Sequence, residues 1–326
     1  MRSATVIVPT LMGGDRLRDS LDSLAAQTVE HEVIVVDNGS GGDAVSRVCE
    51  RRSGVEVVRL DRNAGFSRAV NLGARRASGD AIVLVNDDCR CDPGFVEAIT
   101  RALDPPHGVT MAAGVMRDGR DPRLIDTAGI ELDGTLLGFD YLNGEELSRL
   151  DGPVPDPVGP SGTAAAYDRG AFADAAGFDE RLFAYWEDVD LALRLRSMGG
   201  RCALARAARG THAHSATFGS GSRRKNYLMG FGRGYVLRKW GVLRSPGRIG
   251  ATIARDGVVC LGQAVLDRNL AGVRGRVRGY RSATRTEPFP NDAVTEDAPG
   301  PVVNLRRRAT RRARLRRGDP SGSRRA

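Results

Sequence analysis

The chain has 326 residues, and its 49 Lys and Arg against 40 Asp and Glu give a net charge of +9. This charge is unevenly spread, because residues 1–218 carry −9, residues 219–280 carry +11 and residues 301–326 carry +9. An acidic body with a basic carboxyl-terminal third excludes a basic nucleic-acid-binding fold that covers the whole chain.

The first hundred residues predict strands that alternate with helices. Short apolar segments with β-branched residues predict strands at residues 4–9, 32–36, 55–60 and 81–85. Helical spacing of apolar residues predicts helices that begin behind Asp15, which we expect as a cap, and that cover residues 43–52 and 67–77. This alternation is typical of βαβ units, and it predicts an α/β fold with a parallel sheet covered on both faces.

The regular alternation ends after the fourth predicted strand. Residues 124–142 are rich in Gly and Asp and predict a hairpin or loop, while residues 151–162 (DGPVPDPVGPSG) exclude a regular helix or central strand. A helical pattern returns over residues 187–198. Basic amphipathic helices are expected over residues 219–280, and a disordered Arg-rich tail over residues 281–326.

The cysteines and the hydropathy pattern predict neither disulfides nor a membrane span. The five cysteines are odd in number and contain no CxxC pair, which also argues against a zinc site built from cysteine. No uninterrupted apolar stretch approaches the length of about 18 residues that a span needs, and the first apolar segment is too short for a signal peptide. We therefore expect a cytosolic protein.

Polar residues follow three of the predicted strands. They are Pro9-Thr10, Asp37-Asn38-Gly39-Ser40 and Asn86-Asp87-Asp88. Each acidic cluster alone favours a turn or a helix cap, but ligands of open α/β sheets bind outside the carboxyl ends of strands. Carboxylates that converge there repel one another unless a cation or a ligand donor separates them, and hard cations prefer oxygen ligands. Mg²⁺ or Mn²⁺ bridging a diphosphate is therefore the expected occupant.

No glycine-rich phosphate loop follows any predicted strand. Neither GxGxxG nor GxxxxGK[ST] occurs there, and Gly13-Gly14 and Gly41-Gly42 are too sparse to form one. Their absence argues against a dinucleotide oxidoreductase and against a P-loop ATPase.

Six segments in unbroken order carry a resemblance to a known family. They are VIVPT at 6–10, VVDNGS at 35–40, RNAGFSRAVNLG at 62–73, ASGDAIVLVNDD at 77–88, SGTAAAYDRGAFADAAGFDERLFAYWEDVDLALRLRSMGG at 161–200 and THAHSATFG at 211–219. Over about residues 4–240 the chain resembles glycosyltransferase family 2 enzymes of GT-A fold, especially the bacterial rhamnosyltransferase-like branch.

The resemblance implies an architecture. We expect a GT-A type, Rossmann-like αβα sandwich with a mostly parallel central sheet, followed by carboxyl-terminal amphipathic helices and a disordered basic tail. The catalytic domain would cover residues 1–218, with a nucleotide-sugar half over about 1–110 and an acceptor half over about 111–218.

The resemblance also implies a role for each matching residue. The nucleotide-sugar site would contain Pro9, Thr10, Asp37, Asn38, Arg62, Asn63, Gly65, Asn86 and Asp87, with Asp37 accepting from the base. The Asp-x-Asp motif falls on Asn86-Asp87-Asp88, which leaves Asp88 as the metal-binding carboxylate. His214 would complete the metal or diphosphate site, and His212 is its rival.

The acidic motif at Glu187-Asp188 would be catalytic, with Asp188 as the general base. Inverting transfer needs one carboxylate to deprotonate the acceptor hydroxyl, opposite a charge-neutralised leaving diphosphate. Without the resemblance, acids in the first turn of a helix are simply favoured by its dipole. Trp186 and Asp190 are expected to contact the acceptor, although Trp186 is equally well explained as a core residue.

The basic region over residues 219–280 leaves three interpretations open. Its mixture of Arg, Lys and aromatic residues suits an interfacial helix on an anionic membrane, a cradle for a lipid-diphosphate acceptor, or plain packing with a solvated charged face. Together with the Arg-rich tail it predicts a membrane surface over residues 219–326. Specific nucleic-acid binding is disfavoured, and an oligomer is left open.

Two functions of different classes follow. The first is a metal-assisted inverting glycosyltransferase, which moves a sugar, with rhamnose favoured, from a UDP- or dTDP-sugar. Its acceptor would be a cell-envelope polysaccharide or a polyprenyl-diphosphate-linked glycan, on the inner face of the cell membrane. The alternative is a catalytically degenerate GT-A fold that docks on membranes or nucleic acid, which the presence of both Asp88 and Asp188 disfavours. A nucleotidyltransferase is disfavoured because no Gly-rich basic loop follows the first strand.

Overall fold

The computed structural model describes residues 2–50, 52–213, 221–284 and 287–295, together with 298, 300 and 302. The chain forms two compact units. The first unit consists of Met1–Leu132, Gly138–Thr217 and Pro290–Thr295, and the second of Asp133–Leu137, Phe218–Phe289 and Glu296–Ala326.

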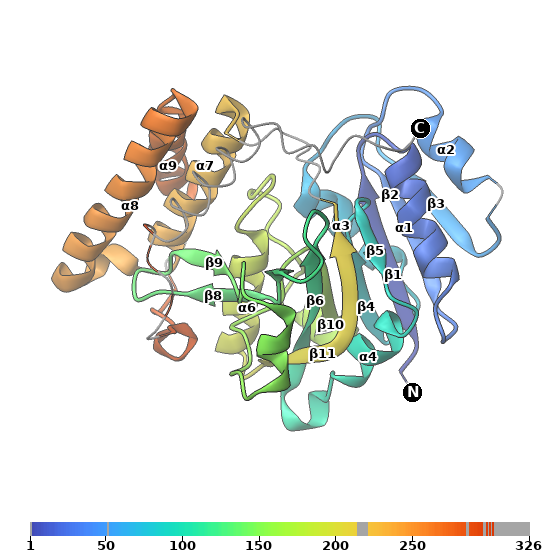
Figure 1. The fold of residues 1–326 in the computed structure, drawn as a ribbon. Helices are drawn as coiled ribbons and strands as arrows, with labels where there is room; N and C mark the ends of the chain where they lie inside the picture. The colour runs from blue at the N-terminus through green and yellow to red at the C-terminus, as the bar shows by residue number, and fades with distance from the viewer. Residues whose placement is uncertain are drawn as a thin grey trace. The chain divides into compact units, whose positions relative to one another are not determined.

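A sheet of nine strands, counted over the described residues, forms the centre of the first unit (Figure 1). Its strands are β1 (Ala4–Thr10), β2 (Glu32–Asp37), β3 (Val55–Arg59), β4 (Ala81–Val85), β5 (Cys89–Cys91), β6 (Val109–Asp118), β7 (Ile125–Thr127), β10 (Ala164–Asp168) and β11 (Arg201–His212). The strand order is β3-β2-β1-β4-β10-β6-β11-β5, with β7 paired to β6.

The sheet is parallel in its amino-terminal half and mixed beyond it. Strands β3, β2, β1 and β4 pair in parallel, as the βαβ pattern predicted. Strand β10 then runs antiparallel to both β4 and β6, although β6 and β11 are parallel again. The expected α/β sheet is thus confirmed, with antiparallel strands confined to the half that the sequence left irregular.

Helices cover both faces of the parallel half. Helices α1 (Asp15–Ala25), α2 (Ala44–Cys49) and α4 (Phe95–Arg101) bury their apolar residues in one core with alternate residues of the strands, such as Val6 and Val8. Helix α3 (Phe66–Arg76) packs on the other face, where the backbone at Gly73 meets Ile7. Because successive strand residues point to opposite faces, these contacts place the sheet between two helical layers.

The irregular half of the first unit contains shorter elements. They are the 3₁₀ turns η1 (Pro105–His107), η2 (Leu147–Asp151) and η4 (Asn291–Ala293), the strands β8 (Ile130–Leu132) and β9 (Gly138–Asp140), and the helices α5 (Arg169–Asp174) and α6 (Glu187–Ser197). The hairpin expected within residues 124–142 is β8–β9, and no regular helix or strand forms over residues 152–162. Asp15 differs from its prediction, because it is the first helical residue of α1 and Gly14 occupies the cap position.

The second unit is helical, as the basic region predicted. It contains α7 (Arg223–Lys239), the turn η3 (Val242–Arg244), α8 (Pro246–Asp267) and α9 (Ala271–Ser282). Helices α7 and α9 approach backbone to backbone through glycines, so that a Cβ at Gly234 would lie 2.0 Å from the carbonyl oxygen of Arg276. Glycine is therefore required at this crossing.

Two findings qualify the sequence expectations for the carboxyl-terminal third. Of the helices that the structure describes, α8 is long and apolar enough to cross a membrane, with a mean hydropathy of 1.3 over its best window. A search for uninterrupted apolar stretches does not find this helix, because a few charged residues divide it.

Residues 287–295, expected to be disordered, make contacts instead, since the Thr295 N–H donates to the Leu132 carbonyl (2.7 Å). Most of the Arg-rich segment after them lies outside the described residues.

The glycine crossing of α7 and α9 can be tested by adding a methyl group. We expect Gly234→Ala to lower the free energy of unfolding by about 1–3 kcal/mol, because the new Cβ overlaps a backbone oxygen that cannot move alone. Gly257→Ala on α8 is the control, because no atom lies within 4 Å of its Cβ and alanine favours a helix by about 0.5–1 kcal/mol. Urea unfolding followed by circular dichroism measures both. Equal stability of the two variants would contradict the close crossing.

Candidate active site

The carboxyl ends of β1, β2 and β4 bring the three predicted polar clusters to one edge of the sheet. Strand β1 lies between the other two, and Thr10 is in register with Asp37 of β2. On its other side, the Thr10 hydroxyl donates to the carboxylate of Asp87 (2.5 Å), just after β4. Hydrogen bonding across the sheet edge thus joins residues that are 77 positions apart in the chain.

The loop after β2 is built around a buried carboxylate. Asp37 is 1% exposed and accepts hydrogen bonds from the backbone N–H (2.7 Å) and the hydroxyl (2.9 Å) of Ser40. Arg59 of β3 lies 3.5 Å from the same carboxylate. These contacts fix the turn and place Asp37 beside the end of β1, next to buried Pro9.

A second loop, residues 62–65, is tied to the first through an asparagine. The Asn38 side chain donates to the Gly65 carbonyl (3.1 Å) and accepts from the Ala64 N–H (2.9 Å). Gly39 has a φ of 81°, and a Cβ there would lie 2.3 Å from the Arg62 carbonyl carbon, so only glycine fits. Asn63 is half-buried and Arg62 is exposed. The structure thus joins the predicted nucleotide-sugar residues of both loops.

The cluster after β4 contains two neighbouring carboxylates. Burial raises the pKa of Asp87 to about 6, the Thr10 hydrogen bond opposes that rise, and the nearby Asp88 charge adds to it. Asn86, in the position of the motif's first acid, donates instead to the Thr163 hydroxyl (3.4 Å). An amide at this position removes one negative charge from an edge that is already crowded with carboxylates.

His212, at the end of β11, lies between two carboxylates. Its Nε2 is 3.3 Å from Asp88, and its Nδ1 is 2.7 Å from Asp126 of β7. Burial alone would lower the pKa of His212, but the hydrogen bonds and charges of Asp126 and Asp88 outweigh it and raise the pKa to about 10. With no metal ion bound, these carboxylates favour a proton on each ring nitrogen, and a cation bound at Nε2 would take the place of the proton there.

The same atoms fit a divalent cation. Donor atoms of Asp88, Cys89 and His212 lie within 4.8 Å of one another. The 3.3 Å between the Asp88 and His212 donors matches adjacent ligands of an octahedral ion with bonds of about 2.1 Å, which lie about 3 Å apart. Cys89 is a poor candidate, because burial raises the pKa of its thiol well above the ordinary value. His214, the other predicted ligand, lies outside the described residues.

Two strained residues precede the acidic pair at the start of α6. Tyr185 and Trp186 have φ of 72° and 76°, a region that side chains other than glycine rarely adopt. The turn brings Glu187 and Asp188 into the first turn of the helix, where the dipole favours negative charge. Strain of this kind is concentrated at functional sites.

Asp188 and Glu187 occupy different environments. Asp188 is partly exposed and accepts from the N–H groups of Val189 (2.8 Å) and Gly162 (3.3 Å). Burial raises the pKa of Asp188, and these hydrogen bonds oppose the rise. Glu187 is buried, and burial followed by the Asp188 charge raises its pKa well above normal. Because Glu187 is buried while Asp188 is partly exposed, burial favours the neutral form more strongly at Glu187 than at Asp188.

The residues predicted to contact an acceptor are both buried. Trp186 is 7% exposed, which leaves it little surface for a sugar. Asp190 is fully buried and forms an ion pair with Arg194 one turn later (2.9 Å). Arg194 in turn donates to the carbonyls of Ala175 and Gly177. This placement gives Asp190 a structural partner within the fold.

Two acidic residues near the site were absent from the sequence prediction. Asp126 contacts His212 directly, and Asp140 of β9 interacts electrostatically with Asp126 and Asp188. Asp140 is reached by solvent, yet surrounding protein atoms and those two carboxylates raise its pKa to about 7. Both lie in the Gly- and Asp-rich segment that reads as a loop. The high Asp content of this segment is the sequence feature that indicates acidic residues there, but it does not reveal which strand they face.

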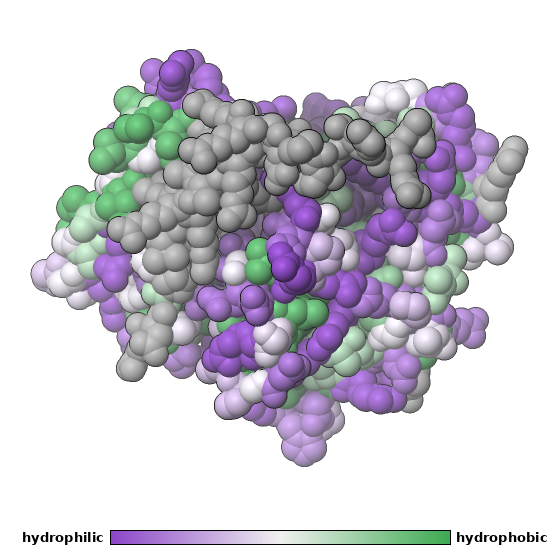
Figure 2. All heavy atoms as spheres, in the orientation of Figure 1, coloured by the Kyte–Doolittle hydropathy of each residue, from purple (hydrophilic) through white to green (hydrophobic). Residues whose placement is uncertain are grey.

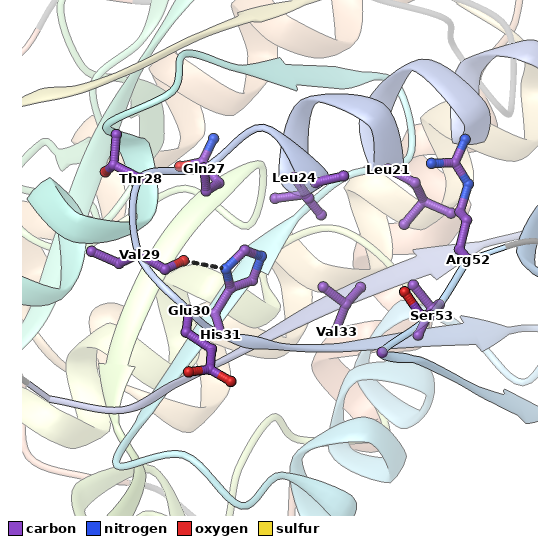
Figure 3. A pocket seen from close by; sticks show the side chains of 13 residues that line it. Leu21, Leu24, Gln27, Thr28, Val29, Glu30, His31, Val33, Arg52 and Ser53 are labelled. Atoms are coloured by element: carbon purple, nitrogen blue, oxygen red, sulfur yellow. Dashed lines mark hydrogen bonds between the residues drawn. The ribbon is translucent and has the colours of Figure 1, made fainter.

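A separate hollow of about 580 Å³ lies at the opposite end of β2 (Figure 3). The hollow is lined by apolar Leu21, Leu24 and Val33 together with Arg52 and His31. The His31 ring is hydrogen-bonded to the Val29 carbonyl (2.9 Å). It lies at the amino end of the strand and contains none of the predicted site residues. The carboxyl-end cluster is therefore the better candidate for chemistry.

Several known proteins are similar to this chain in sequence. The family model described as glycosyl transferase family 2 matches residues 5–174. The O-antigen biosynthesis protein RfbC of Myxococcus xanthus is 29% identical over 65% of this chain, although the match spans only 17% of that protein. The N-acetylglucosaminyl-diphospho-decaprenol L-rhamnosyltransferase of Mycobacterium tuberculosis is 29% identical over 60% of this chain and 70% of its own length.

A solved structure shares the fold. The mannosyltransferase PcManGT from Pyrobaculum calidifontis, in complex with GDP-Man and Mn²⁺, matches 98% of this chain and 81% of its own with a TM-score of 0.54. The sequence identity is 17%, so the likeness is one of fold.

The structural role of Asp190 can be separated from a role in acceptor binding. We expect Asp190→Ala to lower the free energy of unfolding by about 3 kcal/mol, because it leaves the Arg194 charge without its buried partner. The control is Asp174→Ala, an exposed acid nearby on α5, which should change stability by less than about 0.5 kcal/mol. Thermal and urea unfolding measure both. If Asp190→Ala unfolds with the same free energy as the parent protein but has a raised KM for the acceptor, Asp190 binds the acceptor after all.

Proposed function

Because the chain belongs to glycosyl transferase family 2 and is a glycosyltransferase of GT-A fold, we propose that it performs an inverting sugar transfer from a UDP- or dTDP-sugar. We assign the reaction to a catalytic domain over residues 1–218. The observation that carries the proposal is the Asp188 carboxyl group, held by backbone N–H groups at the start of α6, in electrostatic contact with the acidic edge that includes Asp140.

The relatives support a finer choice of substrates. One of them is named as a rhamnosyltransferase that acts on a decaprenol-linked glycan, and another as an O-antigen biosynthesis protein. We therefore propose rhamnose as the donated sugar and a cell-envelope polysaccharide or a polyprenyl-diphosphate-linked glycan as the acceptor. Such an acceptor would place the reaction at the cytoplasmic face of the cell membrane.

Asp188 is the proposed general base. Its carboxylate takes the proton of the acceptor hydroxyl as that oxygen attacks the anomeric carbon, and the bond from that carbon to the nucleoside diphosphate breaks. Hydrogen bonds from the Val189 and Gly162 N–H groups aim the carboxylate, and the adjacent Glu187 stays neutral. A neutral neighbour keeps a second negative charge away from the base.

The nucleoside diphosphate is proposed to bind at the ends of β1, β2 and β4. Asp37 and Asn38 would meet the nucleoside beside Pro9 and Thr10, while the 62–65 loop approaches the phosphates, with Arg62 offering a cation. Asp88 and His212 would hold Mg²⁺ or Mn²⁺. When bound, the ion supplies the positive charge that stabilises the leaving diphosphate.

Substitutions of the acidic pair test the assignment of the base. We expect Asp188→Asn to lower kcat by about 10²–10⁴-fold, because the amide cannot accept the proton. Glu187→Gln should lose far less, since burial and the Asp188 charge raise the pKa of Glu187 and so favour its neutral form. The measurement is release of UDP or dTDP from a panel of sugar nucleotides, with and without Mn²⁺. Full turnover by Asp188→Asn would overturn the proposed base.

The pH profile is a second readout of the same assignment. A base acts only when deprotonated, and burial raises the pKa of Asp188. The parent enzyme should therefore lose kcat/KM as the pH falls, and at a higher pH than an ordinary exposed carboxylate would require. The control is Asp174→Asn, which replaces an exposed acid and should leave the pH profile unchanged.

A further substitution tests how the cation site is held. Asp126 fixes the His212 ring through Nδ1, and such outer partners support metal affinity by about 10–100-fold. We expect Asp126→Ala to weaken Mn²⁺ binding in that range, and Asp126→Asn to weaken it less because the amide oxygen still accepts from the ring. Paramagnetic resonance of free Mn²⁺, in the presence of UDP, measures the affinity.

The exposed acid Glu146 provides a control for that measurement. Glu146→Gln also removes one negative charge, but at a position that makes no contact with the His212 ring. Equal Mn²⁺ affinity of Asp126→Ala and Glu146→Gln would show that His212 needs no support from Asp126.

A further inference from the structure

The charged side chains in the middle of helix α8 are paired with charges on its neighbours. Within the second unit, Arg255 lies 2.7 Å from Asp133, and Asp256 lies 3.1 Å from Arg233. Arg233 has no exposed surface and also donates to the Thr135 carbonyl (2.9 Å). The middle of α8 is therefore held to its neighbours by ion pairs and not by an apolar stripe.

The outward side of α8 is apolar. Ile253, Leu261 and Val265 are 67%, 64% and 66% exposed, whereas the charged Arg255 side chain is 39% exposed and is paired with Asp133. This surface continues for about 24 Å at 1.5 Å per residue. A helix on the surface of a water-soluble protein shows the reverse pattern, with its apolar side on the core.

Helix α9 adds to the same character. Leu270, Val273 and Val277 are exposed, and they alternate with exposed arginines at 274, 278 and 281. Figure 2 shows hydrophobic side chains gathered at the upper left edge, where Figure 1 draws α8 and α9. Arginine stems of this kind lie along apolar material while their charged ends reach water or phosphate.

We propose that this apolar face, formed by Ile249, Ile253, Leu261, Val265, Leu270, Val273 and Val277, docks α8 and α9 in the interface of an anionic lipid bilayer. The arginines beside it complement acidic headgroups, at about 1 kcal/mol for each basic residue near such a surface. The inference deepens the proposed function, because a polyprenyl-linked acceptor resides in a membrane.

Other occupants of the face fit less well. A second copy would bring the arginines of α9 against those of its partner. The Arg-rich segment 301–326 contains ten Arg, so it carries the same sign of charge as that edge. Although α8 has the length of a span, crossing a bilayer would place the Arg255–Asp133 and Asp256–Arg233 pairs at hydrocarbon depth. An orientation in the plane of the interface keeps those pairs out of the hydrocarbon and buries the apolar face.

The test is sedimentation of the full-length protein with vesicles, without donor or acceptor. We expect binding to phosphatidylcholine vesicles that contain phosphatidylglycerol, and at least about tenfold weaker binding to phosphatidylcholine alone, because several arginines contribute. Leu261→Ser should weaken binding by about tenfold, since burial of a leucine side chain is lost. The control is Met198→Ser at the end of α6, also well exposed at 55%, which should bind as the parent does.

Each variant keeps its fold because the replaced side chain is already exposed, so equal melting temperatures separate loss of docking from unfolding. Binding unchanged in Leu261→Ser, or no binding of the parent to anionic vesicles, overturns the proposal. A dimer in solution that dissociates in Leu261→Ser would assign the face to a second copy instead and would also overturn it.

Depth distinguishes docking from spanning. Native Trp186 and Trp240 are both buried and thus shielded from lipid-bound bromine, so the quenched part of the fluorescence of Leu261→Trp reports on the face. We expect quenching by lipids brominated near the headgroup to exceed quenching by lipids brominated near the bilayer centre, and the reverse order would indicate a span and overturn the proposal. Sugar transfer to a short, soluble acceptor remains measurable in either case, so failure of docking and failure of the proposed function are distinguishable.

Discussion

The repulsion among carboxylates at one sheet edge is the constraint on which the candidate site depends. Asp87, Asp88, Asp126, Asp140 and Asp188 interact electrostatically there, and burial raises the pKa of several of them. The fold separates their charges by specific partners. The Thr10 hydroxyl meets Asp87, the His212 ring lies between Asp88 and Asp126, and N–H groups hold Asp188. Carboxylates gathered in this way are the oxygen ligands that a divalent cation prefers.

The second unit solves a related problem by the opposite arrangement. There the buried charges are paired, because Asp256 meets both Arg233 and Arg276. Taking charges out of water is costly unless geometry and further hydrogen bonds compensate, and Thr135 supplies two of those bonds to Arg233. With Asp256 buried in these pairs and Arg255 paired to Asp133, the most exposed large side chains of α8 are apolar. The buried ion pairs and the exposed apolar face are thus two consequences of one arrangement.

Local patterns predicted the parallel half of the sheet and the positions of its polar ends. Alternation of strands with helices and the residues after each strand are readable along the chain, and Thr10, Asp37 and Asp88 lie where that pattern placed them. Partners distant in sequence were not predictable in this way. The contact between Asp126 and His212 joins residues 86 positions apart through pairing of β7 and β11 with β6, which no periodicity reveals. The outward side of α8 was missed for a similar reason, since net charge does not say which side of a helix its arginines face.

The position of the proposed base depends on how the turn before it is held. Tyr185 and Trp186 each adopt a conformation that costs on the order of 1–3 kcal/mol. Neighbouring contacts offset that cost. The Phe66 N–H donates to the Phe183 carbonyl (2.7 Å) and the Ser67 hydroxyl to that of Leu182 (2.5 Å).

On the far side of the strained turn, the buried Asp190–Arg194 pair secures α6, and Arg194 also binds the carbonyls of the preceding loop. A turn fastened at both ends leaves Asp188 little freedom to move. The strained turn and the buried Asp190–Arg194 pair therefore act together, and they fix the position of the proposed base before any substrate binds.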